Sequence, residues 1–261
     1  MLNVIFFAGL VLYFAAAVLE FVGMVFKKQS VTKIAWLLFL VGAGCNTVYL
    51  VIRGVLAGRL PLSNQFEFAT AFAWGLAVML IIMQTRFRAE WIRAAAMPMA
   101  FLILSYAALQ PKEITELMPA LKSAWFGFHI GSAVFSYSAF VLAGCGGLRW
   151  LLLNKKGVTD QLAQIDYLCY RLVALGFLLL TVVILTGAIW AEQAWSAFWT
   201  WDPKEVWALI TWIIYTVYFH IRVRKQKDGY WLCWYVILAV PAFLFTFAGV
   251  NKLIPGLHSY G

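Results

Sequence analysis

Three histidines are the side chains of this chain best suited to bind a metal ion. His129 lies in SAWFGFHIGS, His220 in YTVYFHIR and His258 in NKLIPGLHSYG. Neutral imidazole is a common metal ligand, and haem iron takes one axial ligand on each face. His129 and His258 lack a neighbouring nucleophile motif, so they fit a bis-imidazole haem site better than a catalytic pair. An ordinary interfacial role for each histidine is the alternative.

A tryptophan-rich segment, WSAFWTWDPKEVW at 195–207, places aromatic surface beside charge. A belt at the bilayer interface accounts for two or three such tryptophans, but not for a cluster. A flat apolar ligand such as a porphyrin buries well against indole rings. We therefore predict a platform for a planar ligand. The cluster comprises six tryptophans within 23 residues: Trp190, Trp195, Trp199, Trp201, Trp207 and Trp212.

The residues DPKE at 202–205 predict the start of a helix. Asp202 suits the N-cap, Pro203 the first helical position and Glu205 the third, as in a capping box. Such a helix directs free N–H groups and its positive dipole end toward the tryptophans, and Lys204 adds positive charge. The propionates of a haem would be stabilised there. For Asp202, capping alone is a sufficient role.

The composition indicates which elements position these residues. The chain has 261 residues, of which 64% are hydrophobic and 12% charged, with a mean hydropathy of +0.85. Soluble domains are usually about 45–50% apolar. Since a membrane span needs roughly 20 apolar residues, we predict an all-α polytopic membrane protein, with 1–261 as one integral-membrane domain. Its eight transmembrane helices are expected at 3–26, 34–53, 66–84, 92–109, 124–153, 168–191, 206–221 and 231–250.

The first of these segments lacks a basic n-region and an A-x-A site, so we interpret it as a span and not as a cleaved signal peptide. Lys and Arg concentrate in alternate connections, and cytoplasmic loops carry such an excess. Both termini and segment 190–207 are then predicted outside. The inner set holds 14 of the 20 basic residues: Lys27, Lys28, Lys33, Arg86, Arg88, Arg93, Arg149, Lys155, Lys156, Arg171, Arg222, Arg224, Lys225 and Lys227.

This topology separates the histidines. His129 and His258 share the outer side with the tryptophans. Fourteen residues at about 1.5 Å each place His220 roughly 21 Å deeper than Val206. His220 therefore belongs to a second, inner site, or it is an interfacial residue beside Arg222. The net charge of +9 reflects topology; without a contiguous basic face, we expect no nucleic-acid partner.

Other polar residues and the cysteines carry weaker signals. Glu20 is an acid inside the first span, either functional or paired with a basic or hydroxyl neighbour. PLSNQFEF at 61–68 is a turn before the third span, with Glu67 as a first-turn acid. The four cysteines lack C-x-x-C spacing and are expected to pack as small apolar residues. Glycines near two of them, at 42, 44, 144, 146 and 147, predict close helix contacts.

The stretch WTWDPKEVWALITWIIYTVYFHIR resembles the WWD motif of the CcsA/ResC cytochrome c assembly family. The resemblance extends to PLSNQFEF, to WFGFHI around His129 and to GVNKLIPGLHSY near the C-terminus, and so covers nearly the whole chain. It implies eight spans with both ends outside. It also implies a role in cytochrome c-type biogenesis of the System II kind.

The resemblance implies that the protein moves haem b to the outer side and presents it to apocytochrome c. There, the cysteines of a C-x-x-C-H motif form thioethers with the haem vinyl groups. His129 and His258 would be the axial ligands, and His220 the family's transmembrane histidine on the inner route. The residues that match the WWD segment are Trp195, Trp199, Trp201 and Asp202, with Trp190 and Trp207 close by.

In one respect the sequence departs from the family pattern. The first tryptophan of the motif is usually followed by glycine, whereas Ser196 follows Trp195 here. The resemblance also implies a partner of the CcsB/ResB type in the inner or plasma membrane. The two proteins together would form a haem lyase, of which this chain is a subunit that is not catalytic alone.

Two alternatives stay open. HemX-like relatives of this family are linked to tetrapyrrole biosynthesis. A non-catalytic membrane subunit could instead hold another flat anionic ligand, such as a quinone, without iron ligands. A b-type electron-transfer cytochrome fits less well, because it would need histidine pairs facing one another within the bundle.

Overall fold

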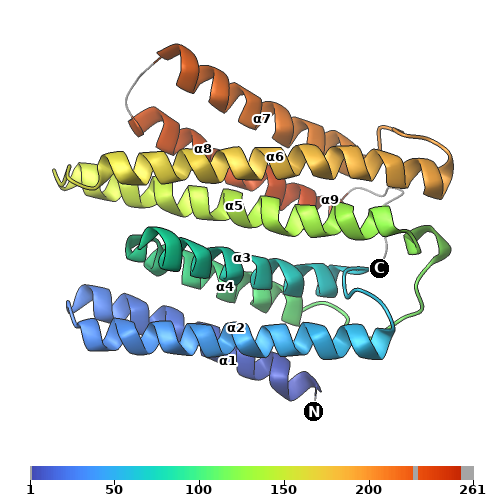
Figure 1. The fold of residues 1–261 in the computed structure, drawn as a ribbon, viewed down its shortest axis with the longest axis horizontal. Helices are drawn as coiled ribbons and strands as arrows, with labels where there is room; N and C mark the ends of the chain where they lie inside the picture. The colour runs from blue at the N-terminus through green and yellow to red at the C-terminus, as the bar shows by residue number, and fades with distance from the viewer. Residues whose placement is uncertain (1, 226–228, 254–261) are drawn as a thin grey trace. The chain divides into compact units, whose positions relative to one another are not determined.

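The computed structural model describes residues 2–225 and 229–253, and within these residues it contains helices and no strands (Figure 1). Eight helical segments there are long and apolar enough to cross a membrane, which confirms the predicted number. The main helices are α1 Leu2–Val25, α2 Gln29–Ala57, α3 Gln65–Phe87, α4 Arg93–Ala108, α5 Ala124–Lys155, α6 Leu162–Trp195, α7 Pro203–Lys225 and α8 Gly229–Leu244.

Four short helical segments accompany them: η1 Glu90–Ile92, η2 Pro119–Leu121, the π-helix η3 Phe245–Gly249 and α9 Val250–Leu253. Several main helices extend beyond the predicted spans. For example, α2 begins five residues before the apolar segment, and α6 begins six residues before its own. Hydropathy marks only the part of a helix that suits the hydrocarbon core, and polar first turns continue the helix past it.

The chain divides into two compact units, Met1–Glu116 and Leu117–Gly261. In the N-terminal unit, α1 packs against α2 and α4, and α3 packs against α4 and α2. In the C-terminal unit, α5 packs against α6 and α8, and α7 packs against both α8 and α6. One haem-handling domain over 1–261, with 190–207 as its outer segment, stays a prediction.

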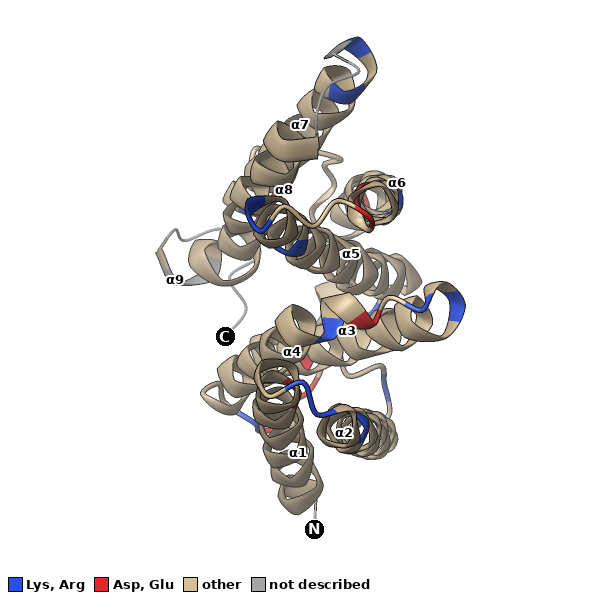
Figure 2. Cartoon of the chain, turned by 90° about the vertical axis from the view of Figure 1, so that its left-hand side faces the viewer, with Lys and Arg blue, Asp and Glu red and all other residues tan. Residues whose placement is uncertain are grey.

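Basic residues mark one end of each unit. In the N-terminal unit, the α1–α2 and α3–α4 turns lie together at one end of the helices (Figure 1). In the C-terminal unit, the α5–α6 turn lies at one end of α5 and α6. Figure 2 shows the Lys and Arg residues of these turns in blue. Which face of the membrane these turns meet, and the outer placement of both termini, stay predictions from the positive-inside rule.

The N-terminal unit contains a buried ion pair between α1 and α4. The Nε atom of Arg93 donates to Oε1 of Glu20 at 3.0 Å, and both side chains are almost fully buried. The guanidinium of Arg93 also lies 5.6 Å from the ring centre of Trp36. The sequence left Glu20 as either a functional residue or one paired with a basic or hydroxyl neighbour. The structure shows the pairing with a basic neighbour, Arg93.

A second buried group joins α2 to the start of α3. Glu67 is fully buried and accepts hydrogen bonds from Arg53 Nε at 2.9 Å, Arg59 Nη1 at 2.8 Å and the Ser63 backbone N–H at 2.8 Å. Asn64 caps α3 by accepting from the Glu67 backbone N–H. Glu67 is thus a first-turn acid, as predicted, and also the centre of a charged network.

The same network fastens the connection that follows α4. Arg53 donates to the carbonyl oxygens of Lys112 at 2.8 Å and of Glu113 at 3.1 Å. Arg59 donates to the carbonyl of Thr115 at 3.4 Å. Buried backbone carbonyls need hydrogen-bond partners. Arg53 and Arg59 supply them and so hold the irregular segment after α4 in place.

The cysteines behave as packing residues. All four are free, and Cys145, Cys169 and Cys233 are buried. A Cβ atom added to Gly147 would lie 3.0 Å from the Cys233 carbonyl oxygen, and one added to Gly144 would lie 2.8 Å from a Val240 methyl group. These glycines therefore allow close approach of α5 and α8, as predicted. The prediction was wrong for Gly44, because a Cβ atom added there would meet open space.

Candidate functional site

His129 lies in the second turn of α5, where its orientation is fixed by α6. Ser123 caps α5 by accepting from the Trp125 backbone N–H. The Nδ1 atom of His129 lies 2.8 Å from the carbonyl oxygen of Val183. Since a carbonyl only accepts, Nδ1 carries the proton, and in the neutral ring Nε2 carries the lone pair. Histidines that bind metals commonly donate their other N–H to such a carbonyl.

Trp190 supports the His129 ring. The two rings are stacked, with centroids 5.9 Å apart and an interplanar angle of 24°. Trp190 is almost fully buried, and its Nε1–H donates to the Ala120 carbonyl at 2.7 Å. Trp195, five residues later on α6, meets Trp190 edge-on, with ring centroids 5.1 Å apart. The structure therefore brings together three of the predicted residues, which we call the His129–Trp190–Trp195 cluster.

Apolar residues from the segment before α5 and from α5 itself pack around Trp190. Leu121, Phe126 and Trp190 form a buried core, against which Leu117 and Trp195 also pack. The Ser123 hydroxyl donates to Gln193 Oε1 at 2.7 Å and so ties the start of α5 to the end of α6. Sequence reasoning missed Leu121 and Phe126, because apolar residues next to a membrane span carry no distinguishing signal.

Ser196 ends α6 in the left-handed conformation. Its φ angle is 56°, and its backbone N–H donates to the Glu192 carbonyl at 2.9 Å. Helices commonly end with a left-handed residue, which is usually glycine because an L-residue is strained there. The glycine that the family motif usually carries at this place is explained by this backbone. Ser196 itself adopts this left-handed geometry, with a φ angle of 56°.

The segment that follows presents aromatic rings at the surface. Trp199 and Trp201 meet edge to face at 5.8 Å, with an interplanar angle of 89°. Trp201 is 69% exposed, and its φ angle of 60° is again left-handed. A bulky exposed residue in this region of backbone space is strained, and such strain is concentrated at functional sites.

The predicted capping box is present at the start of α7. The Asp202 side chain accepts from the Lys204 backbone N–H at 3.0 Å, and Glu205 accepts from the Asp202 backbone N–H at 3.1 Å. Glu205 also accepts from the Thr200 backbone N–H at 2.8 Å. The two acids therefore join the tryptophan segment rigidly to the helix that follows it.

Trp207 lies one turn into α7 and packs against η3, which follows α8. Its ring centre is 4.4 Å from that of Phe245, the first residue of the π-helix η3. π-Helical turns are rare in proteins, and those that occur are frequently found at functional sites. The chain continues through α9 toward His258, which lies outside the described residues.

His220 lies toward the end of α7, far from Trp207. It is an exposed residue thirteen positions after Trp207, or roughly 20 Å along the helix axis. Two residues later, Arg222 forms a two-pronged ion pair with Asp166 of α6, at 2.7 and 3.0 Å. The structure therefore separates His220 from the His129–Trp190–Trp195 cluster, as the sequence predicts.

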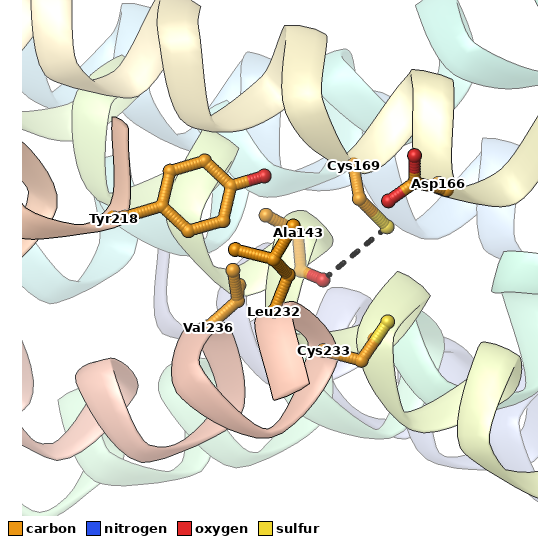
Figure 3. A pocket seen from close by; sticks show the side chains of 8 residues that line it. Ala143, Asp166, Cys169, Tyr218, Leu232, Cys233 and Val236 are labelled. Carbon is orange, nitrogen blue, oxygen red and sulfur yellow. Dashed lines mark hydrogen bonds between the residues drawn. The ribbon is translucent and has the colours of Figure 1, made fainter. Parts of the chain in front are cut away.

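Near this end of α7, a small cleft opens between α5, α6, α7 and α8 (Figure 3). Asp166, Tyr218 and Cys233 line it, and the Cys169 thiol donates to the Ala143 carbonyl at 3.7 Å. Its lining combines two buried thiols with one acid that is already paired with Arg222. These contacts are those of a packed helix junction.

The chain is similar in sequence to known proteins of one family. A family model described as "Cytochrome C assembly protein" matches residues 62–258. The chain is 32% identical over 272 residues to "Cytochrome c biogenesis protein CcsA" of Prochlorococcus marinus (strain MIT 9301), covering 92% of this chain and 88% of that protein. The match to CcsA of Guillardia theta is 32% over 269 residues, covering 92% and 89%.

CcsA of Synechococcus sp. (strain CC9605) is 31% identical over 292 residues, covering 98% of this chain and 95% of that protein. The family match begins just before α3 and includes all three histidines and the whole tryptophan segment. The chain therefore belongs to the cytochrome c assembly protein family, and it is a multi-pass membrane protein of cytochrome c biogenesis.

Proposed function

We propose that this protein binds haem b at the outer face of the membrane and presents it for covalent attachment to apocytochrome c. Membership of the family implies haem and apocytochrome c as participants. The observation that carries the proposal for this chain is the His129 ring, held by the Val183 carbonyl and stacked on Trp190. An imidazole held in this way is prepared to bind iron through Nε2.

The residues of the site would divide the work among three parts of haem. Nε2 of His129 would bind the iron on one face, and His258 would bind it on the other. The rings of Trp195, Trp199 and Trp201 would cover the porphyrin plane. The N-terminus of α7, with Lys204, would stabilise the propionates.

Ligation on both faces leaves the vinyl edge of haem for the reaction. Each cysteine S–H of the apocytochrome would add across one vinyl C=C bond. The sulfur would form a bond to one vinyl carbon, and the hydrogen would be transferred to the other. No oxidant or reductant is consumed in that addition. The protein's contribution is to orient haem, while haem supplies the reactive group.

A second membrane protein of the CcsB/ResB type is proposed to cover α7. Exposed residues on one face of this helix include Ile213, Val217 and His220. Ionisable side chains inside membranes almost always face protein or a water-filled cavity. We propose that His220 contacts the partner and binds haem on the inner route, in the inner or plasma membrane.

The orientation follows the distribution of basic residues. The α1–α2 and α3–α4 turns of the N-terminal unit carry or adjoin Lys27, Lys28, Arg86 and Arg88, and the α5–α6 turn of the C-terminal unit carries or adjoins Lys155 and Lys156. This distribution favours a cytoplasmic position for these turns. The opposite end of each helix then faces the periplasm or outer side. The tryptophan segment, both termini and the haem site are therefore proposed to be outside.

Haem spectra of the full chain, purified with its partner from haem-replete cells, test the ligand assignment. We expect His129→Ala and His258→Ala each to lose the six-coordinate spectrum and to regain it with added imidazole. Phe128→Ala, an exposed neighbour of His129, is the matched control. Wild-type spectra in both histidine variants would contradict the axial assignment, and complete absence of haem from the wild type would favour another flat ligand.

Cross-linking tests the proposed partner surface. Val217→Cys shares a face of α7 with His220, whereas Leu178→Cys is an exposed control on α6. We expect the first to cross-link to the partner in membranes and the second not to do so. Equal yields at the two positions would contradict a partner surface on α7.

A further inference from the structure

Two aromatic side chains of α5 pack into glycine positions of α6. A Cβ atom added to Gly187 would lie 2.7 Å from Nδ1 and 2.9 Å from Cε1 of His129. A Cβ atom added to Gly176 would lie 2.6 Å from Cε1 of Phe140. Along α5, His129 and Phe140 are eleven residues apart, and along α6, Gly176 and Gly187 are also eleven residues apart. Eleven residues make about three helical turns, so one face of α5 meets one face of α6 at two levels.

The glycine at 187 also determines access to the Val183 carbonyl. A helical side chain covers the turn that precedes its own Cα atom. Val183 lies one turn before Gly187, and its carbonyl accepts from the Gly187 backbone N–H within a regular helix. The same oxygen accepts the His129 Nδ1–H at 2.8 Å. A side chain at 187 would stand where the imidazole now reaches this oxygen.

We propose that Gly187 is a positioning residue for His129. Its missing side chain allows the ring to reach the Val183 carbonyl, which fixes the proton on Nδ1 and the lone pair on Nε2. The proposal rests on the proposed role of His129 as a haem ligand. Gly187 would act through His129 and would not contact haem.

The second glycine contact sets the register that delivers His129 to this position. The Ser136 hydroxyl donates to the Gly176 carbonyl at 2.8 Å, beside the Phe140 ring. Phe140 in turn stacks face to face on Tyr215 of α7, with ring centroids 3.7 Å apart. The Ser136–Gly176 hydrogen bond and the Phe140 ring at Gly176 hold α5 and α6 together independently of His129. We therefore expect a small side chain at 187 to displace the imidazole and not the helices.

The variant Gly187→Ala is expected to break the Nδ1–H bond. Loss of such an outer hydrogen bond typically lowers affinity at a metal site by roughly 10–100-fold. We expect haem affinity to fall within that range, and the haem reduction potential to shift to more positive values, because the imidazole becomes a weaker donor. Gly131→Ala is the matched control, since Gly131 is two residues from His129 on α5 and faces open space.

A measurement without haem tests the geometry directly. In the full chain with its partner in membranes, ¹⁵N-histidine NMR distinguishes protonation at Nδ1 from protonation at Nε2, with His129→Gln giving the assignment. We expect an Nδ1–H tautomer in the wild type and in Gly131→Ala, and a shifted or mixed tautomer in Gly187→Ala. An Nε2–H tautomer in the wild type would overturn the proposal even if Gly187→Ala accumulates poorly.

A double-mutant cycle separates positioning from general damage. In a His129→Gly background supplied with free imidazole, the ligand is no longer tethered to α5. Gly187→Ala should then have no further effect on haem affinity. An equal loss in both backgrounds, or behaviour of Gly187→Ala like that of Gly131→Ala, would overturn the proposal.

The same set of variants distinguishes failure of the ligand assignment from failure of the positioning role. If His129→Gly binds haem as the wild type does, the proposed ligand is wrong, and the NMR result still decides whether Gly187 orients the ring. If His129→Gly loses haem while Gly187→Ala matches its control, only the positioning role is wrong.

Discussion

The His129 ring donates through Nδ1 to the Val183 carbonyl, 2.8 Å away and 54 residues later in the chain. The contact joins α5 to α6 and sets the tautomer of the imidazole. It belongs to the helix pair and not to the tryptophan motif that first draws attention in the sequence. Tests of the proposed ligand site therefore need substitutions in the tryptophan motif and also at the interface between α5 and α6.

Ser196 offers a test of backbone strain. Because its φ angle is 56°, Ser196→Gly should relieve left-handed strain and raise the free energy of unfolding by about 1 kcal/mol, without loss of haem. Ser196→Val should lower it by at least as much. Thermal unfolding in detergent, with haem content measured in parallel, checks both; a destabilised glycine variant would contradict the argument.

Trp201 offers a test in which stability and function separate. It is 69% exposed with a φ angle of 60°, so Trp201→Gly removes strain but also removes an exposed ring. We expect unchanged or slightly higher unfolding free energy, by up to about 1 kcal/mol, together with lower haem retention. Equal haem retention in this variant and the wild type would exclude Trp201 from the proposed platform.

Asp202 can act as a cap or through its charge. Asn at an N-cap is about as favourable as Asp, whereas Ala costs about 1 kcal/mol. We therefore expect Asp202→Asn to match the wild type in stability and haem content, and Asp202→Ala to be destabilised. If Asp202→Asn is stable but fails to mature cytochrome c in cells, the carboxylate has a role beyond capping.

The Glu20–Arg93 pair tests whether an acid within the first span is structural. Removing one partner of a buried pair typically costs about 3–5 kcal/mol, while replacing both with apolar residues is often neutral. We expect Glu20→Leu to accumulate poorly in membranes and Glu20→Leu with Arg93→Met to recover. Recovery of protein level without recovery of cytochrome c maturation would show that Glu20 also has a functional role.

Local signals predicted the elements of this fold well. Apolar length was sufficient for the eight helices, and the order Asp-Pro-Lys-Glu was sufficient for the capping box at 202–205, because each depends on neighbouring residues alone. To predict that Trp190 and Trp195 lie near His129, each connection between helices had to be assigned to one face of the membrane. Basic residues supplied that choice.

Contacts between helices were not predictable from one sequence. Glu20 meets Arg93 across 73 residues, and His129 meets Val183 across 54. Hydropathy shows which segments are in lipid but not which faces of them meet. Gly187 illustrates the limit, since a glycine within an apolar helix has the same appearance whether it faces a ring or open space, as Gly44 does.

The length of α6 determines where chemistry at its end can take place. Its 34 residues rise about 51 Å, whereas the hydrocarbon core is about 30 Å thick. In the proposed orientation, the last turns, with Trp190 and Trp195, stand in the headgroup region or beyond it. A water-soluble polypeptide can then bring its cysteine thiols to the rings without transferring any part of its own backbone into lipid.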